Sequence, residues 1–178
     1  HQSKAGIVLA SAYQVPSDIG VFDVATFSMV LLHMRDPFLA LKKVLECTTS
    51  TVVITEMFPW SFMPEDIQRV FGARRSVPGP VEGFSRTVPG DVAAMVSEES
   101  PTMFFCPKAA SGVPRETWWH FTPSIIQEFI AVLGFETERI LYHYQMHDPQ
   151  YQWTTSSGSD LKKTLHPCFT VVGQRERR

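Results

Sequence analysis

The sequence predicts an α/β fold, and three observations support this prediction. The apolar run Val21–Phe27 is typical of a parallel strand that is buried on both faces. Asp36 and Pro37 then form a strong helix start, with Asp36 as the N-cap and Pro37 at the first helical position. The β-branched run Thr51–Glu56 predicts a second core strand. Strand, helix and strand in this order form a βαβ unit, for which we expect a right-handed crossover.

The flanking segments extend this unit. Gly6–Ala10 is short and apolar and predicts a further strand before a turn at Asp18 and Gly20. The helix that follows Asp36 carries an apolar stripe made of Phe38, Leu41, Val44 and Leu45.

Residues 57–117 differ in character, because they contain eight of the 13 prolines and half of the ten glycines. Only Pro64–Phe71 has a helical pattern there. A loop-rich stretch of this length inside a domain is typical of a lid or a binding insertion, unless it is disordered. Its many aromatic residues favour an ordered cover.

Regular structure is predicted again after Thr117. Thr122 is expected to cap a helix that has Pro123 at its first position and ends at Gly134. Phe135–Gln145 and Cys168–Val172 then read as strands. No helix is predicted between these two strands, so we expect them to be antiparallel neighbours.

Composition narrows the classes of function. The 178 residues fit one domain, 1–178, and a formal net charge of −2 argues against a nucleic-acid partner. No apolar run is long enough for a membrane span, and the first residues do not form a signal peptide. The three cysteines suit neither a disulfide framework nor a metal site. A reduced cytoplasmic protein is the default expectation.

Four groups of residues together resemble the C-terminal part of a class I S-adenosylmethionine-dependent methyltransferase. The resemblance is closest to the group that contains the tRNA wobble-uridine carboxymethyltransferase-like enzymes and their small-molecule relatives. It spans roughly residues 5–56 and 117–173 and implies a partial Rossmann-like sheet with strands equivalent to 3-4-5-7-6. The residues that carry it are Phe22-Asp23, Val30-Leu-Leu-His33 with Arg35-Asp-Pro37, Ile54-Thr-Glu56, and Trp118-Trp119 before Pro123 with Gly134-Phe135.

The resemblance also implies roles for individual residues. The positions that would face S-adenosylmethionine are Ser11, Ala12, Tyr13, Ser28, Met29 and Val30. The positions that would face the acceptor are Arg35, Trp118 and Trp119, together with the catalytic candidates His33 and Glu56.

Simpler structural roles remain open for these residues. His33 could cap the strand–helix turn, and the tryptophans could pack around the Thr122 cap. Glu56 ends a buried strand, where an unpaired carboxylate is costly, so it should lie in a solvated cleft or pair with an arginine. We favour the cleft. A metal site is disfavoured because its only candidates are scattered; they are His143, His147, Asp148 and His166.

The sequence also departs from the family pattern. The ten glycines nowhere form GxGxG, and the first two strands of that fold are not found before Gly6. We therefore expect either a fragment of a longer protein or a sheet completed by a second copy, which would pair along the apolar edge 21–27. For this chain alone, binding of S-adenosylmethionine is expected to be weak or absent.

The favoured function is methyl transfer to a small, planar or anionic acceptor. One alternative is modification of the tRNA wobble uridine. The other is a non-catalytic binding or assembly module that has lost affinity for the cofactor. Whether the chain is itself an enzyme stays open at this point.

Overall fold

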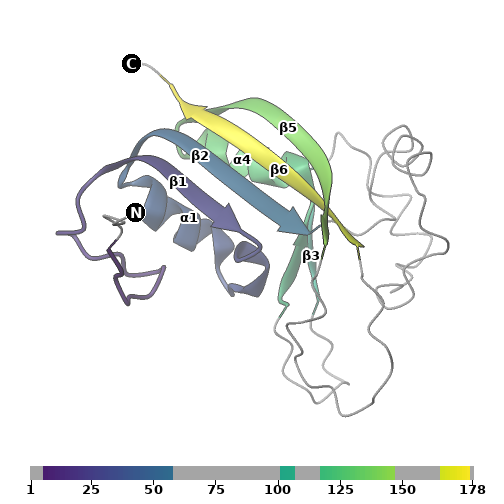
Figure 1. Ribbon diagram of the computed structural model, residues 1–178, viewed down its shortest axis with the longest axis horizontal. Coiled ribbons are helices and arrows are strands. Elements are labelled where there is room, and N and C mark those ends of the chain that lie inside the picture. The colour runs from purple at the N-terminus through teal and green to yellow at the C-terminus, as the bar shows by residue number, and fades with distance from the viewer. Residues whose placement is uncertain (1–5, 58–100, 107–116, 147–164, 177–178) are drawn as a thin grey trace, which may run out of the picture.

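The computed structural model describes residues 6–57, 101–106, 117–146 and 165–176. Two α-helices, one 3-10 turn and six strands make up this part of the chain (Figure 1). In chain order they are β1 (Phe22–Ser28), η1 (Leu31–His33), α1 (Pro37–Leu45), β2 (Thr48–Met57), β3 (Met103–Phe105), β4 (Trp119–Phe121), α4 (Pro123–Val132), β5 (Phe135–Met146) and β6 (Leu165–Arg175). The predicted helix at 64–71 and most of the predicted lid lie outside the described residues.

The main sheet has four strands in the order β1-β2-β6-β5. Strands β1 and β2 are parallel, with Phe27 opposite Ile54, which confirms the βαβ unit. Strand β6 runs antiparallel to both of its neighbours, β2 and β5. The antiparallel pair expected at the end of the chain is thereby confirmed. This mixed α/β arrangement matches the last four strands, 4-5-7-6, of the expected order 3-4-5-7-6. The strand expected as number 3 is not formed in the described residues.

The prediction of a strand at Gly6–Ala10 was wrong, because this segment has no regular structure. Ile7 and Leu9 are 90% and 96% exposed, so the segment buries almost none of its apolar surface. Within the described residues β1 pairs only with β2 and forms the edge of the sheet (Figure 1). An apolar run takes up a strand only when a neighbouring strand satisfies its backbone groups and covers its side chains, and Gly6–Ala10 has no such neighbour there.

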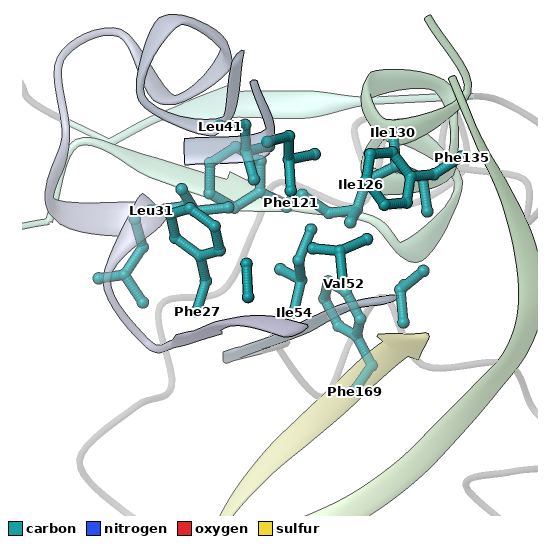
Figure 2. Close-up of a cluster of buried hydrophobic side chains, with 14 residues drawn as sticks. Phe27, Leu31, Leu41, Val52, Ile54, Phe121, Ile126, Ile130, Phe135 and Phe169 are labelled. Atoms are coloured by element: carbon teal, nitrogen blue, oxygen red, sulfur yellow. The ribbon is translucent and has the colours of Figure 1, made fainter. Parts of the chain in front are cut away.

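The hydrophobic core lies between the sheet and the two helices, which cover the same face of the sheet (Figures 1 and 2). Alternate residues of the strands point into it, and the helices add their apolar stripes. Its fully buried members include Val52, Ile54, Phe169, Leu41, Leu45, Ile126 and Ile130. On the other face Val24 and Leu141 are about half exposed, and no described helix covers them.

Both helices begin at the residues that the sequence predicts. The Asp36 carboxylate accepts a hydrogen bond from Leu39 N at 2.8 Å, and the Thr122 hydroxyl accepts one from Ile125 N at 3.4 Å. Gly134 has a φ of +82°, a left-handed conformation that glycine adopts without strain and that stops α4. Neither described helix has the length and apolarity that a membrane crossing needs.

Two close contacts fix the ends of the helices against the sheet. A Cβ atom at Gly173 of β6 would lie 2.6 Å from Ile130 Cδ1 of α4, so the missing side chain lets the helix approach the sheet. The Arg175 guanidinium donates hydrogen bonds to Leu45 O at 2.7 Å and Thr48 O at 2.9 Å. It thereby ties the C-terminal end of α1 to the end of β6.

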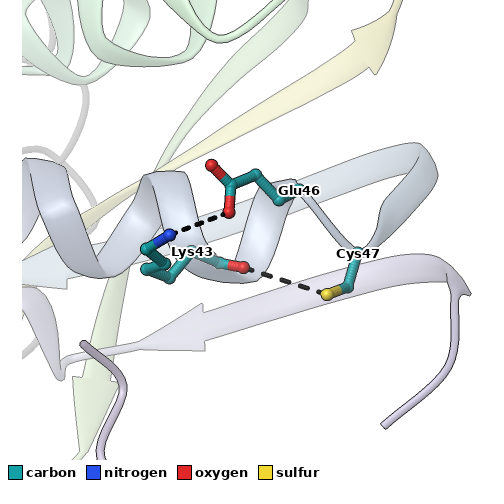
Figure 3. Close-up of polar contacts among 3 residues, drawn as sticks. All are labelled: Lys43, Glu46 and Cys47. Carbon is teal, nitrogen blue, oxygen red and sulfur yellow. Dashed lines mark hydrogen bonds and ion pairs between the residues drawn. The ribbon is translucent and has the colours of Figure 1, made fainter. Parts of the chain in front are cut away.

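Figure 3 shows two polar contacts at the C-terminal end of α1. Lys43 Nζ and Glu46 Oε2 form an exposed ion pair at 3.2 Å. The Cys47 thiol is partly buried and donates to Lys43 O at 3.9 Å. Cys47 therefore packs against the end of the helix, as its position in the sequence indicates.

Candidate functional site

The candidate site begins where β1 ends. Ser28 is exposed, and Met29 N donates to Thr55 O at 2.8 Å, so Met29 still follows the edge of β2. Met29 has a φ of +52°, a left-handed conformation that costs a non-glycine residue on the order of 1 kcal/mol. The chain therefore turns sharply at this residue and passes directly into η1.

Arg35 and the two tryptophans are brought together by the structure. The Arg35 guanidinium carbon lies 5.0 Å from the centre of the Trp118 ring, within the range of a cation–π interaction. The Trp119 indole donates to Arg35 O at 3.2 Å. Residues that lie far apart in the sequence thus form one surface, and we call Arg35, Phe105, Trp118 and Trp119 the aromatic platform.

Phe105 is the member of the platform that was not predicted from the sequence. Its ring centre lies 5.2 Å from that of Trp119 and 6.1 Å from that of Trp118, and the residue is 59% exposed. It comes from β3, which pairs with β4 so that Phe105 lies opposite Trp119. The only signal in the sequence was the aromatic pair Phe104-Phe105 inside a proline-rich stretch, which did not predict a strand.

The backbone of Trp118 links the platform to η1. Trp118 N donates to Leu32 O of η1 at 2.7 Å, and Trp118 O accepts from Cys106 N at 2.8 Å. Trp118 therefore bridges η1 and the segment that follows β3. His33, also on η1, is exposed and lies on the same turn as Leu32.

Glu56 lies beneath η1, not in a solvated cleft. Its side chain is fully buried, and its Oε1 accepts a hydrogen bond from Leu31 N at 2.9 Å. Its Oε2 has no hydrogen-bond partner in the part of the chain that the structure describes. Of the two environments considered for Glu56, the cleft is wrong, and no arginine pairs with it among the described residues.

Burial sets the protonation of this carboxyl group. Removal from water disfavours the charged form and raises the pKa of Glu56 from 4.5 to about 7. The Leu31 amide, which donates to Oε1, and the adjacent backbone of Leu32 and Val30 favour the charged form and partly offset the effect of burial on the pKa. Near neutral pH the group therefore exists in both protonation states.

The segment predicted to face the adenine ring also contacts this region. The Tyr13 hydroxyl accepts a hydrogen bond from Asp36 N at 3.2 Å, next to Arg35. Ser11 Oγ accepts from Tyr13 N at 3.2 Å, so residues 11–14 form a turn. No acidic residue occurs in this turn.

A polar chain lies on the sheet face opposite the helices, near the C-terminal end of β2. Thr55 and Thr170 lie opposite each other with their hydroxyls 2.7 Å apart, and His143 Nε2 lies 2.9 Å from the Thr170 hydroxyl. Within the described residues no group of three or more His, Cys, Asp or Glu side chains could hold a metal ion. His147 and Asp148 lie outside those residues, and nothing is described of the side chain of His166.

Comparisons with known proteins give structural likenesses only. No protein-family model matches the sequence, and no curated protein matches it. Among solved structures, a magnesium protoporphyrin IX methyltransferase from Synechocystis with bound S-adenosylhomocysteine is 10% identical, with a TM-score of 0.42; the match covers 94% of this chain and 49% of that one. An S-adenosylmethionine-dependent methyltransferase from Methanosarcina mazei is 12% identical, with a TM-score of 0.49; the match covers 93% of this chain and 65% of that one. This chain thus spans about half to two thirds of the length of these proteins.

Proposed function

We propose that the chain serves S-adenosylmethionine-dependent methyl transfer and holds a small, planar, anionic acceptor on the aromatic platform. The observation that carries this proposal is the cation–π contact of the Arg35 guanidinium with the Trp118 ring, on the segment that follows β1 and η1. The aromatic faces offer a surface for stacking, and the guanidinium can form paired hydrogen bonds with a carboxylate or phosphate. Together they favour an acceptor that has both features.

The residues expected to face the cofactor fit part of that molecule. The half-buried Tyr13 ring is held in place by the hydrogen bond that its hydroxyl accepts from Asp36 N. The ring offers an aromatic surface to adenine. The exposed Ser28 offers a hydroxyl at the end of β1. When bound, S-adenosylmethionine supplies a methyl group on a positively charged sulfur. Such a transfer depends mainly on holding the two reacting atoms in line. The exposed His33 is the residue proposed to take the proton that the acceptor loses.

Nuclear magnetic resonance of the full chain tests both halves of this proposal and detects weak binding. Titration with S-adenosylhomocysteine should shift the amide signals of Tyr13 and of residues 28–30. Titration with 2-naphthoate, a planar anion, should shift the Trp119 indole signal, and the neutral 2-naphthamide should have a smaller effect. In Arg35→Gln the preference for the anion should be lost.

Other outcomes would contradict the proposal. Shifts confined to other parts of the sheet, or none with either ligand, would refute the assigned site. Salt-sensitive retention of bulk tRNA on a filter would instead support an RNA substrate, because contacts with phosphates release counterions.

A further inference from the structure

Glu56 has an unusual environment for a carboxylate. It lies on the core side of β2 in line with Val52 and Ile54, and all three side chains are 0% exposed. One oxygen accepts the Leu31 amide, and the other has no partner among the described residues. A buried charge with incomplete hydrogen bonding destabilises a fold, so stability alone would favour a neutral side chain at this position.

The amide that Glu56 binds belongs to the start of η1. The first amides of a helical turn have no partner within the turn itself and require an external acceptor. His33 N and Met34 N bond back to Val30 O and Leu31 O, which leaves the Leu31 amide to Glu56. Glu56 therefore anchors the first residue of η1 to the end of β2.

The same turn holds the aromatic platform. Leu32 O accepts the Trp118 amide at 2.7 Å, which is the shortest backbone hydrogen bond described outside the regular elements. The Trp119 indole bonds to Arg35 O, shortly after the turn. Hydrogen bonds thus tie η1 to the buried carboxylate at Leu31 and to Trp118 at Leu32, and Arg35, two residues after η1, bonds to Trp119.

We propose that Glu56 is a positioning residue. It fixes the position of η1, so that Leu32 O and Arg35 O can accept the hydrogen bonds that hold the aromatic platform. The carboxylate is fully buried and bonds to the Leu31 amide, so in this proposal it acts through the backbone of η1. The significance of this role for methyl transfer rests on the proposed function. The structural connection between Glu56 and the tryptophans is independent of the proposed function.

Hydrogen exchange of the full chain, without any ligand, tests the connection. Glu56→Met removes the acceptor but keeps the volume, and it also removes the buried charge. We expect the Trp119 indole and Trp118 amide to exchange at least about tenfold faster, since one hydrogen bond is lost. The urea midpoint should stay the same or rise. Glu56→Gln retains an acceptor oxygen and should restore slow exchange.

The matched control is Thr48→Val, at the other end of β2. It removes the hydrogen bond that the buried Thr48 side chain donates from Oγ1 to Val44 O, and it should leave the exchange of the Trp119 indole unchanged. Equal acceleration of the amides of β6 in Glu56→Met would show that Glu56 only supports the fold. Unchanged exchange of the Trp119 indole would show that the connection does not exist. Either result overturns the proposal.

A second measurement separates this proposal from the proposed function. If wild type binds 2-naphthoate, Glu56→Met should weaken that binding and Glu56→Gln should retain it. If wild type does not bind 2-naphthoate, the proposed acceptor class fails, while the exchange experiment still decides the role of Glu56.

Discussion

Glu56 should give the protein a stability that depends on pH in a defined range. Burial raises the pKa of its carboxyl group from 4.5 to about 7, so the folded protein holds this proton more tightly than the unfolded chain does. The stabilising effect is complete below pH 4.5, falls as the pH rises, and is lost above about pH 7. Each pH unit in this range corresponds to ~1.4 kcal/mol, so the total change in the free energy of unfolding is ~3 kcal/mol.

Urea denaturation of wild type and Glu56→Gln between pH 4 and 8.5 measures this effect, because all other titrating groups cancel in the difference between the two proteins. The amide does not ionise, so Glu56→Gln should gain ~3 kcal/mol relative to wild type between the two ends of the range. Any constant difference reports the new hydrogen bonds of the amide and is irrelevant to the test. Glu46→Gln, which removes an exposed carboxylate at the end of α1, should differ from wild type by less than ~0.5 kcal/mol throughout. If the Glu56→Gln difference does not change with pH, the buried carboxylate is not the source of the dependence, and the reasoning is wrong.

Three further predictions concern the frame of the sheet. Gly173→Ala should destabilise the fold by ~1–3 kcal/mol through overpacking against α4, and Ile130→Val in the same chain should recover part of this loss in a double-mutant cycle of urea denaturation. Arg175→Met should lower the free energy of unfolding by ~2 kcal/mol, because two carbonyl groups near the end of α1 lose a charged donor; a loss no larger than that of a surface substitution would contradict this. Val24→Lys should leave the stability unchanged and, if β1 pairs with a second copy, should shift the mass measured by light scattering toward the monomer. A wild type that is monomeric at every concentration would exclude that pairing.

The regular elements were predictable because their signals are local. The strand runs have β-branched and apolar residues, and the two helix starts have a cap followed by proline, so Asp36 and Thr122 fixed the starts of α1 and α4 to the residue. The antiparallel end of the sheet was predicted because the sequence has no helical pattern between the two last strands. The strand ends were predicted less well, and β2 and β6 are longer than expected.

The site was predictable only in part, because its geometry depends on contacts between distant segments. The pairing of Phe105 with Trp119 joins two three-residue strands, which are too short to leave a periodic pattern. The burial of Glu56 depends on how η1 folds over the end of β2, and no pattern around Glu56 itself indicates this. The strand prediction for Gly6–Ala10 was wrong for the same reason, since an apolar run does not reveal whether a neighbouring strand is available.

The sharp turn at Met29 has a consequence for recognising related chains. A left-handed φ at this position excludes β-branched side chains and favours glycine, asparagine or an unbranched residue. The Leu31 amide and the Glu56 carboxylate that meet beyond the turn are 25 residues apart in the sequence. Chains that fold the same way here should therefore combine two features. One is a residue that tolerates a left-handed φ at the end of the first strand, and the other is an acidic or amide side chain near the end of the next strand. This pairing should be recognisable even where overall identity is too low for alignment.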